Sequence, residues 1–534
     1  MRRGIIQTKN EEEGVLMDFI SRSVHVNESG VSLYTLVMLP GEGKWPAVII
    51  RSPYYDAQEQ MSDTEIELKG MEAFREFLEG GYAVIVQHCR GTGRSDGDCV
   101  PYINERVDGL ALQKWIRTQP FYNGELFLYG GSYLCSVHYL TAPYAPDVKG
   151  AVFLKQDTER YNVCYRNGFF KAGLHGDWYV KMFHKKKHIE KSYVKDTFKT
   201  LPLTRFAPLV FGCEQEDWQE TLRHPNREDP FWKTALGGAD ASHVTDSLPF
   251  PALVMTSFYD IYTGGVFDMW DAMTEETRSK CALMVNPYDH SFNETKQPIA
   301  FPKGRPEEQF GCFGVKWFDA IRGKGEYPLP RGKVTYYRLF ENEWRTDDFA
   351  PTGKEIRIPF CEKDVSYDYN PAAPASFKGG LSDNFDGTAW QDEPNSRNDI
   401  RSFISKPFER ETFVKGKMTA KLSVKSDCPD TCIYIRVSLV KENGTYGLRD
   451  DIHSLSEFAP DYVPGETVTI PFTFDDHAFL VKKGESIRVD VSSSAFPYYV
   501  PHTNRKGLYS EQIGYDIAHN TLIGGTGELV VPIE

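Results

Sequence analysis

The residue best placed to do chemistry is Ser132, which stands between a short apolar run and a stretch without glycine or proline. The run at residues 126–129 is followed by Gly130 and Gly131, which is typical of a buried strand that ends in a tight turn. The stretch after the serine, residues 133–142, predicts a helix. Such a junction is the nucleophile elbow, which exposes a serine hydroxyl at the start of a helix. By itself, the pattern is more often a glycine-rich turn with an incidental serine.

Two further residues are of the types that a serine nucleophile needs. Asp260 follows the apolar run 253–257, and His290 follows the apolar run 282–286. A serine hydroxyl is a poor nucleophile until a base takes its proton, and an aspartate can hold a histidine in the tautomer that does so. The chain order Ser132, Asp260, His290 is the order of α/β-hydrolases. We therefore expect Ser132 as the nucleophile, His290 as the general base and Asp260 as the acid that orients it.

The segments that must position these residues alternate between strand and helix patterns. From residue 47 to residue 154, apolar runs alternate with amphipathic segments, which include helices predicted over 70–80 and 105–118. This alternation predicts a largely parallel sheet with helices on both faces. Because reactive groups lie at the carboxyl ends of the strands in such sheets, the three residues are expected at one edge.

Two long stretches depart from the alternating pattern. Residues 156–246 are rich in aromatic and charged side chains without strand alternation, which predicts an inserted helical cap. After residue 350, short alternating runs between Pro, Gly and Asp predict an all-β jelly roll, with residues 443–453 and 497–509 as polar loops. The expected fold class is α/β, with an α/β-hydrolase core (1–155 and 247–350), a helical cap (156–246) and a C-terminal jelly-roll β-sandwich (351–534).

Composition excludes several classes of partner. The 534 residues carry a net charge of −14 without a basic face, so nucleic acid is not an expected partner. The first residues lack the apolar segment of a signal peptide, and no run approaches the roughly 18 apolar residues of a membrane span. The basic run 185–187 is expected on a solvated helix face. Its neighbours His184 and His188 have helical spacing, but no glutamate follows His184 as in a zinc motif.

Neither cofactor nor metal is expected. The ten cysteines are scattered, and Cys428 and Cys432 alone are a weak metal signal. The glycines of residues 87–97 are spaced as in a phosphate loop, but no helix follows directly and no lysine is placed to meet a phosphate. Scattered cysteines inside apolar runs are typical of buried free thiols, which favours a cytoplasmic protein.

Seven motifs together resemble a known family, the cocaine esterase, X-Pro dipeptidyl-peptidase and glutaryl-cephalosporin acylase group of serine hydrolases. The motifs are 51–54 (Arg-Ser-Pro-Tyr), 87–97 (Gln-His-Cys-Arg-Gly-Thr-Gly-Arg-Ser-Asp-Gly), 130–134 (Gly-Gly-Ser-Tyr-Leu), 258–260 (Phe-Tyr-Asp), 286–290 (Asn-Pro-Tyr-Asp-His), 396–399 (Ser-Arg-Asn-Asp) and 492–497 (Ser-Ser-Ser-Ala-Phe-Pro). The resemblance runs nearly end to end. It implies a hydrolase core, a cap inserted before the strand that bears the aspartate, and a C-terminal jelly roll, which is the layout that the periodicity predicts.

The oxyanion of the tetrahedral intermediate needs hydrogen-bond donors. The backbone N–H of Tyr133, the residue after the nucleophile, is expected to be one donor. The resemblance implies that the phenol of Tyr54 is the other, with Tyr55 as the rival in register. Three positions depart from the family's usual residues: Cys135 stands for a glycine, His88 for an aspartate, and Asn-Pro-Tyr at 286–288 for Gly-Pro-Trp. None of them removes a catalytic group.

The sequence favours a carboxylic-ester hydrolase that acts on an uncharged or aromatic acyl group. The α-amino-ester branch is expected to carry acids just after the catalytic aspartate, whereas residues 261–263 here are Ile-Tyr-Thr. Asp157 and Glu159 could meet a substrate ammonium, although a structural role is the commoner one for such acids. Two classes of alternative stay open. The first is another hydrolase, either an X-Pro dipeptidyl aminopeptidase or a β-lactam side-chain acylase. The second is a jelly-roll protein that binds carbohydrate or a partner. A small-molecule ester or amide is the expected substrate, and a homodimer the expected assembly.

Overall fold

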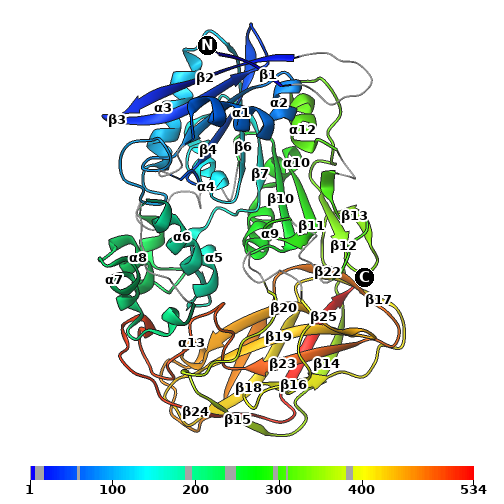
Figure 1. Cartoon of the computed structure of the whole chain (residues 1–534). Coiled ribbons are helices and arrows are strands. Elements are labelled where there is room, and N and C mark those ends of the chain that lie inside the picture. The colour runs from blue at the N-terminus through cyan, green and yellow to red at the C-terminus, as the bar shows by residue number, and fades with distance from the viewer. Residues whose placement is uncertain are drawn as a thin grey trace.

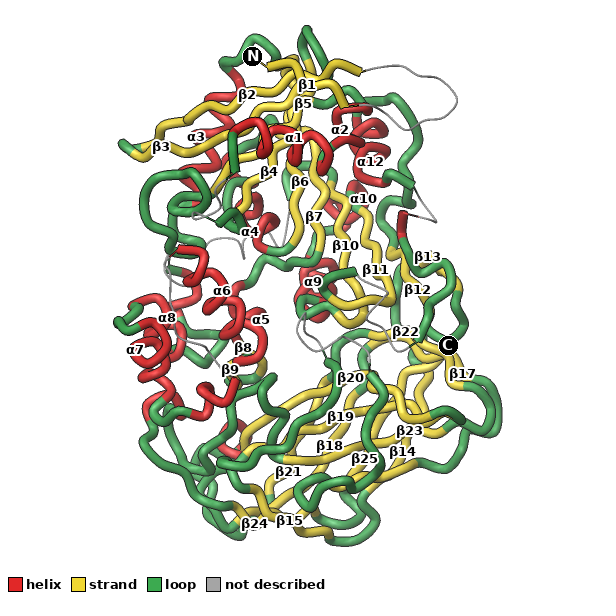
Figure 2. The backbone as a smooth tube through the Cα atoms, viewed as in Figure 1, coloured by secondary structure: helices red, strands yellow, loops and turns green. Residues whose placement is uncertain are grey.

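The computed structural model describes residues 2–6, 17–56, 61–186, 195–234, 248–292, 299–307, 311–380 and 389–534. A large sheet with flanking helices occupies one end of the molecule and C-terminal β-sheets occupy the other (Figure 1). A group of helices lies to one side between them (Figure 1). Along the tube in Figure 2, helices accompany the first sheet, whereas the C-terminal end consists almost wholly of strands and loops.

Eleven strands of the described ranges form the first sheet. In order across the sheet they are β1 (Arg2–Ile6), β2 (Met17–Glu28), β3 (Val31–Leu39), β5 (Ala83–His88), β4 (Trp45–Ser52), β6 (Tyr122–Gly131), β7 (Val148–Leu154), β10 (Ala252–Tyr259), β11 (Ala282–Asp289), β12 (Val334–Arg338) and β13 (Glu343–Asp347). The strands from β5 to β12 are parallel, and antiparallel pairs complete both edges. The parallel strands are continuous apolar runs because helices bury both of their faces.

The helices of this region cover the two faces of the sheet. One face carries α3 (Glu105–Arg117), α4 (Tyr133–Tyr139) and α9 (Thr263–Ala272), and the other carries α1 (Asp63–Ala73), α2 (Arg75–Glu79) and α12 (Phe313–Ile321). The prediction of one helix over 70–80 is wrong. A capping box of Ser62 and Glu65 starts α1 earlier, and the chain leaves helical geometry at Phe74. Gly70 lies within α1 and packs closely on β3, since a Cβ there would come within 2.7 Å of the Leu36 side chain.

Between β7 and β10 the chain leaves the sheet and forms short helices. These are α5 (Arg160–Cys164), α6 (Asp177–Lys186), α7 (Phe206–Phe211) and α8 (Glu216–Arg223), with a small hairpin of β8 (Tyr165–Arg166) and β9 (Phe169–Phe170) and a π-helical turn at Ala172–Gly176. Aromatic side chains fill the interior of this group, where Phe206 stacks on both Phe198 and Trp218. We call this segment the cap, and the domain boundaries given above stay a prediction. Residue 188 and the side chains of the basic run 185–187 lie outside what the structure describes.

The C-terminal part consists of two sheets with antiparallel pairing. The larger contains β15 (Val365–Tyr369), β24 (Ala518–Leu522), β18 (Thr419–Ser426), β25 (Gly527–Ile533), β17 (Thr412–Gly416) and β22 (His477–Val481), with β14 (Lys354–Phe360) beside β25 and β21 (Val468–Thr473) beside β18. The smaller contains β16 (Arg401–Ile404), β23 (Ser486–Ser492), β19 (Cys432–Lys441) and β20 (Gly444–Ser454). We call this part the β-domain. The jelly-roll connectivity stays a prediction.

In the same region, the prediction of a polar loop over 443–453 is wrong. This stretch forms β20, which pairs with β19 along its whole length. Its charged side chains are buried with partners on the neighbouring strand and in the cap. Asp450 pairs with Arg436 at 2.7 Å, and Asp451 pairs with Arg166 of the cap at 2.9 Å. Sequence periodicity does not reveal a strand whose polar residues are buried by tertiary ion pairs.

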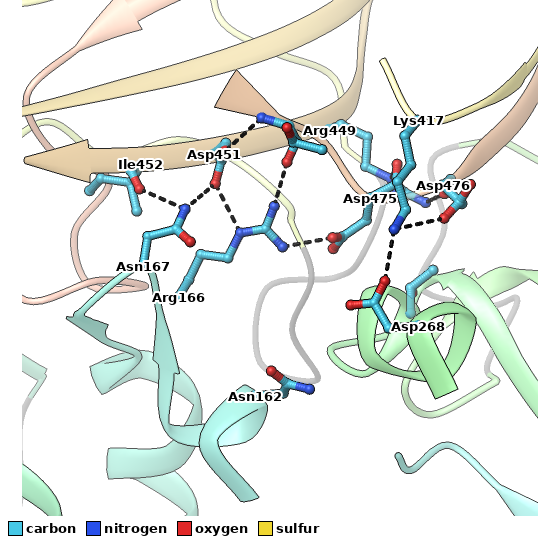
Figure 3. Close-up of polar contacts among 12 residues, drawn as sticks. Asn162, Arg166, Asn167, Asp268, Lys417, Arg449, Asp451, Ile452, Asp475 and Asp476 are labelled. Carbon is cyan, nitrogen blue, oxygen red and sulfur yellow. Dashed lines mark hydrogen bonds and ion pairs between the residues drawn. The ribbon is translucent and has the colours of Figure 1, made fainter. Parts of the chain in front are cut away.

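Ion pairs join the β-domain to the cap and to the hydrolase core. Arg166 on β8 lies between Asp451 and Asp475, with nitrogen–oxygen distances of 2.9 and 2.6 Å (Figure 3). Lys417 lies 2.7 Å from Asp268 of α9 (Figure 3). Removal of Arg166 would leave the buried charges of Asp451 and Asp475 without this partner, which is costly, whereas the Lys417–Asp268 pair is partly exposed to water.

His453 makes this junction sensitive to pH. Burial alone would lower the pKa of His453, but hydrogen bonds to Asp451 and Glu457 outweigh burial and raise its pKa to about 9. A folded-state pKa above the unfolded value of 6.5 stabilises the fold fully below pH 6.5, and this contribution is lost as the pH rises toward 9. His453→Gln should therefore cost most stability near pH 6, by up to about 3 kcal/mol. The difference in Tm between wild type and variant, measured from pH 6 to pH 9, should shrink.

His519→Gln is the matched control for this prediction. The imidazole of His519 also pairs with an aspartate, Asp368, but its side chain is 63% exposed. Exposed pairs contribute little because water screens them. An equal pH dependence in the two variants would contradict the role of the buried ion pair of His453.

None of the helices in the described ranges has the length and apolarity that a membrane span requires. All ten cysteines lie in described ranges as free thiols, and seven of them, Cys135 included, are buried.

Candidate active site

The elbow forms as predicted from its local sequence. β6 ends at Gly131 and α4 begins at Tyr133, so Ser132 alone turns the chain from strand to helix. Ser132 has φ 57° and ψ −132°, a strained conformation for a residue other than glycine. Gly130 is required here, because a Cβ would lie 2.4 Å from the carbonyl oxygen of Leu134. The strained turn at Ser132 exposes its hydroxyl in front of the sheet.

The structure brings Ser132, His290 and Asp260 into one hydrogen-bonded chain. The Nε2 atom of His290 lies 3.0 Å from the Oγ of Ser132, and its Nδ1 atom lies 2.9 Å from the Oδ1 of Asp260. The carboxyl group of Asp260 is fully buried, whereas the imidazole of His290 is 13% exposed. A backbone N–H, that of Tyr262, also donates to Asp260 at 3.1 Å. The carboxylate is thus held in place and aimed at the imidazole.

Sheet topology explains why residues so distant in sequence meet. β6, β7, β10 and β11 are consecutive parallel strands, and each of the three residues follows the carboxyl end of one of them. Ser132 follows β6, Asp260 follows β10 and His290 follows β11. Their side chains therefore reach the same edge of the sheet.

The two candidate tyrosines of the loop after β4 point to different places. Tyr54 borders the same pocket as Ser132 and His290, and its hydroxyl lies 3.4 Å from the indole nitrogen of Trp178. Tyr55 stacks on His88 with 3.7 Å between ring centroids. His88, where the family usually has aspartate, is neutral, because burial lowers its pKa to about 3. The placement of the two rings favours Tyr54 as the donor.

A buried polar network lies behind the elbow, and hardly any feature of the sequence predicts it. The hydroxyl of Tyr133 donates to Glu105 at 3.0 Å and accepts the backbone N–H of Tyr102 at 2.7 Å. Glu105 pairs with Arg51 at 2.8 Å, and Arg51 also donates to Gln87 at 2.8 Å. Arg51 is a charged residue at the end of an apolar strand, which was the one signal available. The network joins the strand that leads to Tyr54 to the residue after the elbow serine.

A pocket of about 320 Å³ opens in front of the serine. Most of its wall is aromatic or aliphatic. The lining residues are Tyr54, Tyr102, Ser132, Tyr133, Val163, Leu174, His175, Trp178, Lys181, Met182, Ile261, Tyr262 and His290. His175 adds no charge, since burial lowers its pKa well below the usual range. The cap and the hydrolase core therefore enclose a mainly apolar site beside the nucleophile candidate.

The departure at Cys135, where the family usually has glycine, is explained by its surroundings. Cys135 is fully buried beneath the elbow, and its Sγ lies 3.0 Å from the carbonyl oxygen of Gly130. Burial raises the pKa of this thiol, so it stays protonated.

The two acids that could meet a substrate ammonium have partners within the protein. Asp157 accepts a hydrogen bond from Asn162 at 2.8 Å, and burial raises its pKa to about 7. Glu159 pairs with Arg227 at 2.8 Å. Neither acid lines the pocket.

Metal ligands do not gather near the site. Over the residues that the structure describes, no three His, Cys, Asp or Glu side chains come together as a metal site would require.

Models of two protein families match most of the chain. Residues 29–292 match the X-Pro dipeptidyl-peptidase (S15 family), and residues 313–528 match the X-Pro dipeptidyl-peptidase C-terminal non-catalytic domain. The chain belongs to the S15 family. The resemblance inferred from the seven motifs is thereby confirmed, and the chain is a serine hydrolase.

Similar proteins are known within and around the S15 family. Cocaine esterase from Rhodococcus sp. (strain MB1 Bresler) is 22% identical over 535 residues, which cover 88% of this chain and 90% of that protein. The solved structure of an alpha-amino acid ester hydrolase has a TM-score of 0.80, 19% identity and 97% coverage of both chains. An aminopeptidase from a marine sediment archaeon, Thaumarchaeota archaeon, has a TM-score of 0.81, 17% identity and 99% coverage of both. These structures confirm the fold class, an α/β-hydrolase core with a C-terminal β-rich domain.

Proposed function

We propose that this S15-family protein hydrolyses carboxylic esters through an acyl-enzyme on Ser132, with His290 as general base and Asp260 as its orienting acid. The observation that carries the proposal is the continuous hydrogen-bonded chain from Ser132 through His290 to the buried Asp260. A hydroxyl within 3.0 Å of an imidazole can lose its proton as it attacks. The carboxylate stabilises the imidazolium that forms.

The proposed reaction has two half-reactions. The Oγ of Ser132 attacks the ester carbonyl while His290 takes its proton, and the C–O bond breaks as His290 returns that proton to the departing alcohol. Water then enters, His290 takes a proton from it, and its oxygen attacks the acyl carbon. The acid leaves and the proton returns to Ser132. In both halves, the negative oxygen would accept hydrogen bonds from the Tyr133 N–H and the Tyr54 hydroxyl.

The pocket supports an uncharged or aromatic acyl group. Its walls are mainly aromatic and aliphatic, and apolar surface binds apolar groups by exclusion of water. The positions after Asp260 hold Ile261, Tyr262 and Thr263, without a carboxylate to hold an ammonium. The nearby acids Asp157 and Glu159 are engaged with Asn162 and Arg227. Cocaine esterase, named for an ester substrate, is consistent with this choice.

The competing activity is removal of X-Pro dipeptides, for which the family is named. A panel of 4-nitrophenyl esters, the matching anilides and X-Pro-4-nitroanilides separates the two. We expect the esters to be cleaved with the highest kcat/KM. Fastest cleavage of the X-Pro anilides would replace this proposal by the peptidase. If a fluorophosphonate probe failed to label the native protein, the binding-protein alternative would be favoured.

Tyr54→Phe tests the proposed oxyanion donor. Loss of one such donor lowers kcat by roughly 100- to 1,000-fold, because the donor acts on charge that develops only in the transition state. KM for 4-nitrophenyl butyrate should change little, as should Tm. Tyr55→Phe is the matched control, since its ring stacks on His88 and is not part of the pocket wall. If Tyr55→Phe lost the activity and Tyr54→Phe kept it, the assignment would be reversed.

Assembly and location remain predictions from the sequence. We infer a small-molecule ester as the partner of the site, a homodimer as the assembly and the cytoplasm as the location. The net charge of −14 supports the expectation that nucleic acid is not a partner.

A further inference from the structure

A second cavity, of about 280 Å³, lies where the cap, the hydrolase core and the β-domain meet. We call it the junction cavity. Its lining includes Asn162, Lys171, Ile261, Asp268, Lys417 and Asp475. The ion pairs of Arg166 with Asp475 and of Lys417 with Asp268 join its walls (Figure 3). The cavity is therefore built from all three regions and is held open by bonds between them.

The junction cavity shares a wall with the active-site pocket. Ile261, the residue after Asp260, borders both spaces. On the cap side, Val163 and Leu174 border the active-site pocket, whereas their near neighbours Asn162 and Lys171 border the junction cavity. A molecule in the junction cavity would thus lie directly behind the wall of the acyl pocket.

One charged group in this cavity differs from the rest. Arg166, Arg227, Lys417, Asp268, Asp450 and Asp475 all line the cavity, and each of them forms an ion pair. Lys171 forms none with the described residues. Its side chain is 95% buried, and its Nζ donates to the carbonyl oxygen of Asn162 at 2.5 Å. An ammonium has three N–H donors, so two of them have no acceptor among the residues that the structure describes.

The electrostatics of Lys171 favour an anionic ligand. Burial and the charge of Arg166 lower its pKa to about 8, while Asp475 and Asp157 oppose this shift. Near pH 7 the ammonium is therefore still mostly charged. A buried charge is costly unless it is paired and hydrogen-bonded. Asp475 pairs with Arg166 at 2.6 Å and does not come within ion-pair distance of Lys171.

We propose that the junction cavity binds the carboxylate of a small organic acid, with the Lys171 ammonium as its counter-ion. A single ammonium matches a singly charged carboxylate. A phosphate dianion would also meet the acidic groups of Asp268 and Asp475 in the same wall. The carboxylate could belong to a free acid or to one arm of an ester held in the active-site pocket. The second source rests on the esterase function proposed above, whereas the first does not.

Calorimetry tests binding of a free acid without any dependence on catalysis. Hexanoate, a singly charged acid, is titrated into the full-length protein, with the neutral hexanamide as its control ligand. Hexanoate alone should bind, and Lys171→Met should weaken its affinity by ~10- to 100-fold, as expected for loss of a charge-assisted hydrogen bond. Lys171→Arg should restore most of the affinity. Lys149→Met, which removes a lysine on the exposed side of β7, should have no effect.

Kinetics test the other source with pairs of esters that differ only in a carboxylate. One pair is mono-4-nitrophenyl adipate and 4-nitrophenyl hexanoate. The other pair is 4-acetoxybenzoate and its methyl ester. If the carboxylate arm of a substrate occupies the cavity, Lys171→Met should raise KM for the acidic ester of one pair by ~10- to 100-fold. It should leave the neutral partner unchanged, which also shows that the variant is folded.

The outcomes separate the possibilities. An effect on an acidic ester assigns the cavity to the substrate, and an effect on hexanoate affinity alone assigns it to a free acid. The proposal is overturned if wild type does not bind hexanoate and Lys171→Met leaves KM for the acidic esters unchanged. Absence of ester hydrolysis with intact hexanoate binding would instead count against the esterase function alone.

Discussion

Replacement of Ser132 by alanine should abolish ester hydrolysis while the fold persists. The Oγ of Ser132 is the only atom of the proposed triad that forms a covalent bond to the acyl carbon, so the acyl-enzyme cannot form without it. In serine hydrolases such a change lowers kcat by on the order of 10⁶-fold, with residual catalysis from the oxyanion donors. Release of 4-nitrophenolate from 4-nitrophenyl butyrate measures the rate. Fluorophosphonate labelling, followed by peptide mapping, should mark Ser132 in wild type and nothing in the variant.

Ser136→Ala provides the control for this experiment. Ser136 lies one turn further along α4 and is buried, but the described structure places it neither in the pocket wall nor in contact with His290. Its variant should keep the activity within a few-fold, and both variants should keep the wild-type circular dichroism. Wild-type turnover in Ser132→Ala would refute the nucleophile assignment.

Replacement of Asp260 by asparagine should lower kcat by about four orders of magnitude with little change in KM. Asparagine has nearly the same shape, but its amide can donate to the Nδ1 of His290. That donation favours the tautomer with its proton on Nε2, which cannot accept the proton of Ser132. Because the carboxylate also stabilises the imidazolium, the variant loses the electrostatic effect as well. A kcat measurement over pH 6–10 on 4-nitrophenyl butyrate tests the expectation.

Asp157→Asn is the matched change at another buried aspartate. Burial raises the pKa of Asp157 to about 7, so much of this group is already neutral near pH 7 and the amide resembles that form. Asp157 does not contact His290 and does not line the active-site pocket. We expect activity close to wild type in this variant. If the two asparagine variants lost activity to the same extent, a general packing defect would explain the result better than the tautomer of His290.

Local sequence was sufficient to predict the elbow and the sheet that presents it. Gly130 is required by backbone geometry, and the apolar runs before Ser132, Asp260 and His290 are long enough to be buried parallel strands. These are local properties, because hydrophobic periodicity and turn chemistry depend on neighbouring residues. The motif order then linked the three residues, and the short distances between them agree with that hypothesis.

Other features could not be predicted because their causes are not local. The sequence predicts a loop at β20 because its charged residues look exposed, whereas Asp450 pairs with Arg436 on the neighbouring strand and Asp451 pairs with Arg166 of the cap. Glu105 and Arg51 likewise form an ion pair between segments that are distant in sequence. Such pairs leave no periodic signal, so periodicity places these buried charged residues at the surface.

The sequence by itself determined the strand–turn–helix geometry at Ser132, the parallel sheet and the order of the three candidate catalytic residues. Only the tertiary structure distinguished Tyr54, which borders the pocket, from Tyr55, which stacks on His88. Only the tertiary structure brought Lys171 into a cavity between three regions without an ion-pair partner among the described residues. The physical reason is the same in each case: backbone geometry follows from adjacent residues, whereas the surroundings of a side chain depend on segments that meet only after folding.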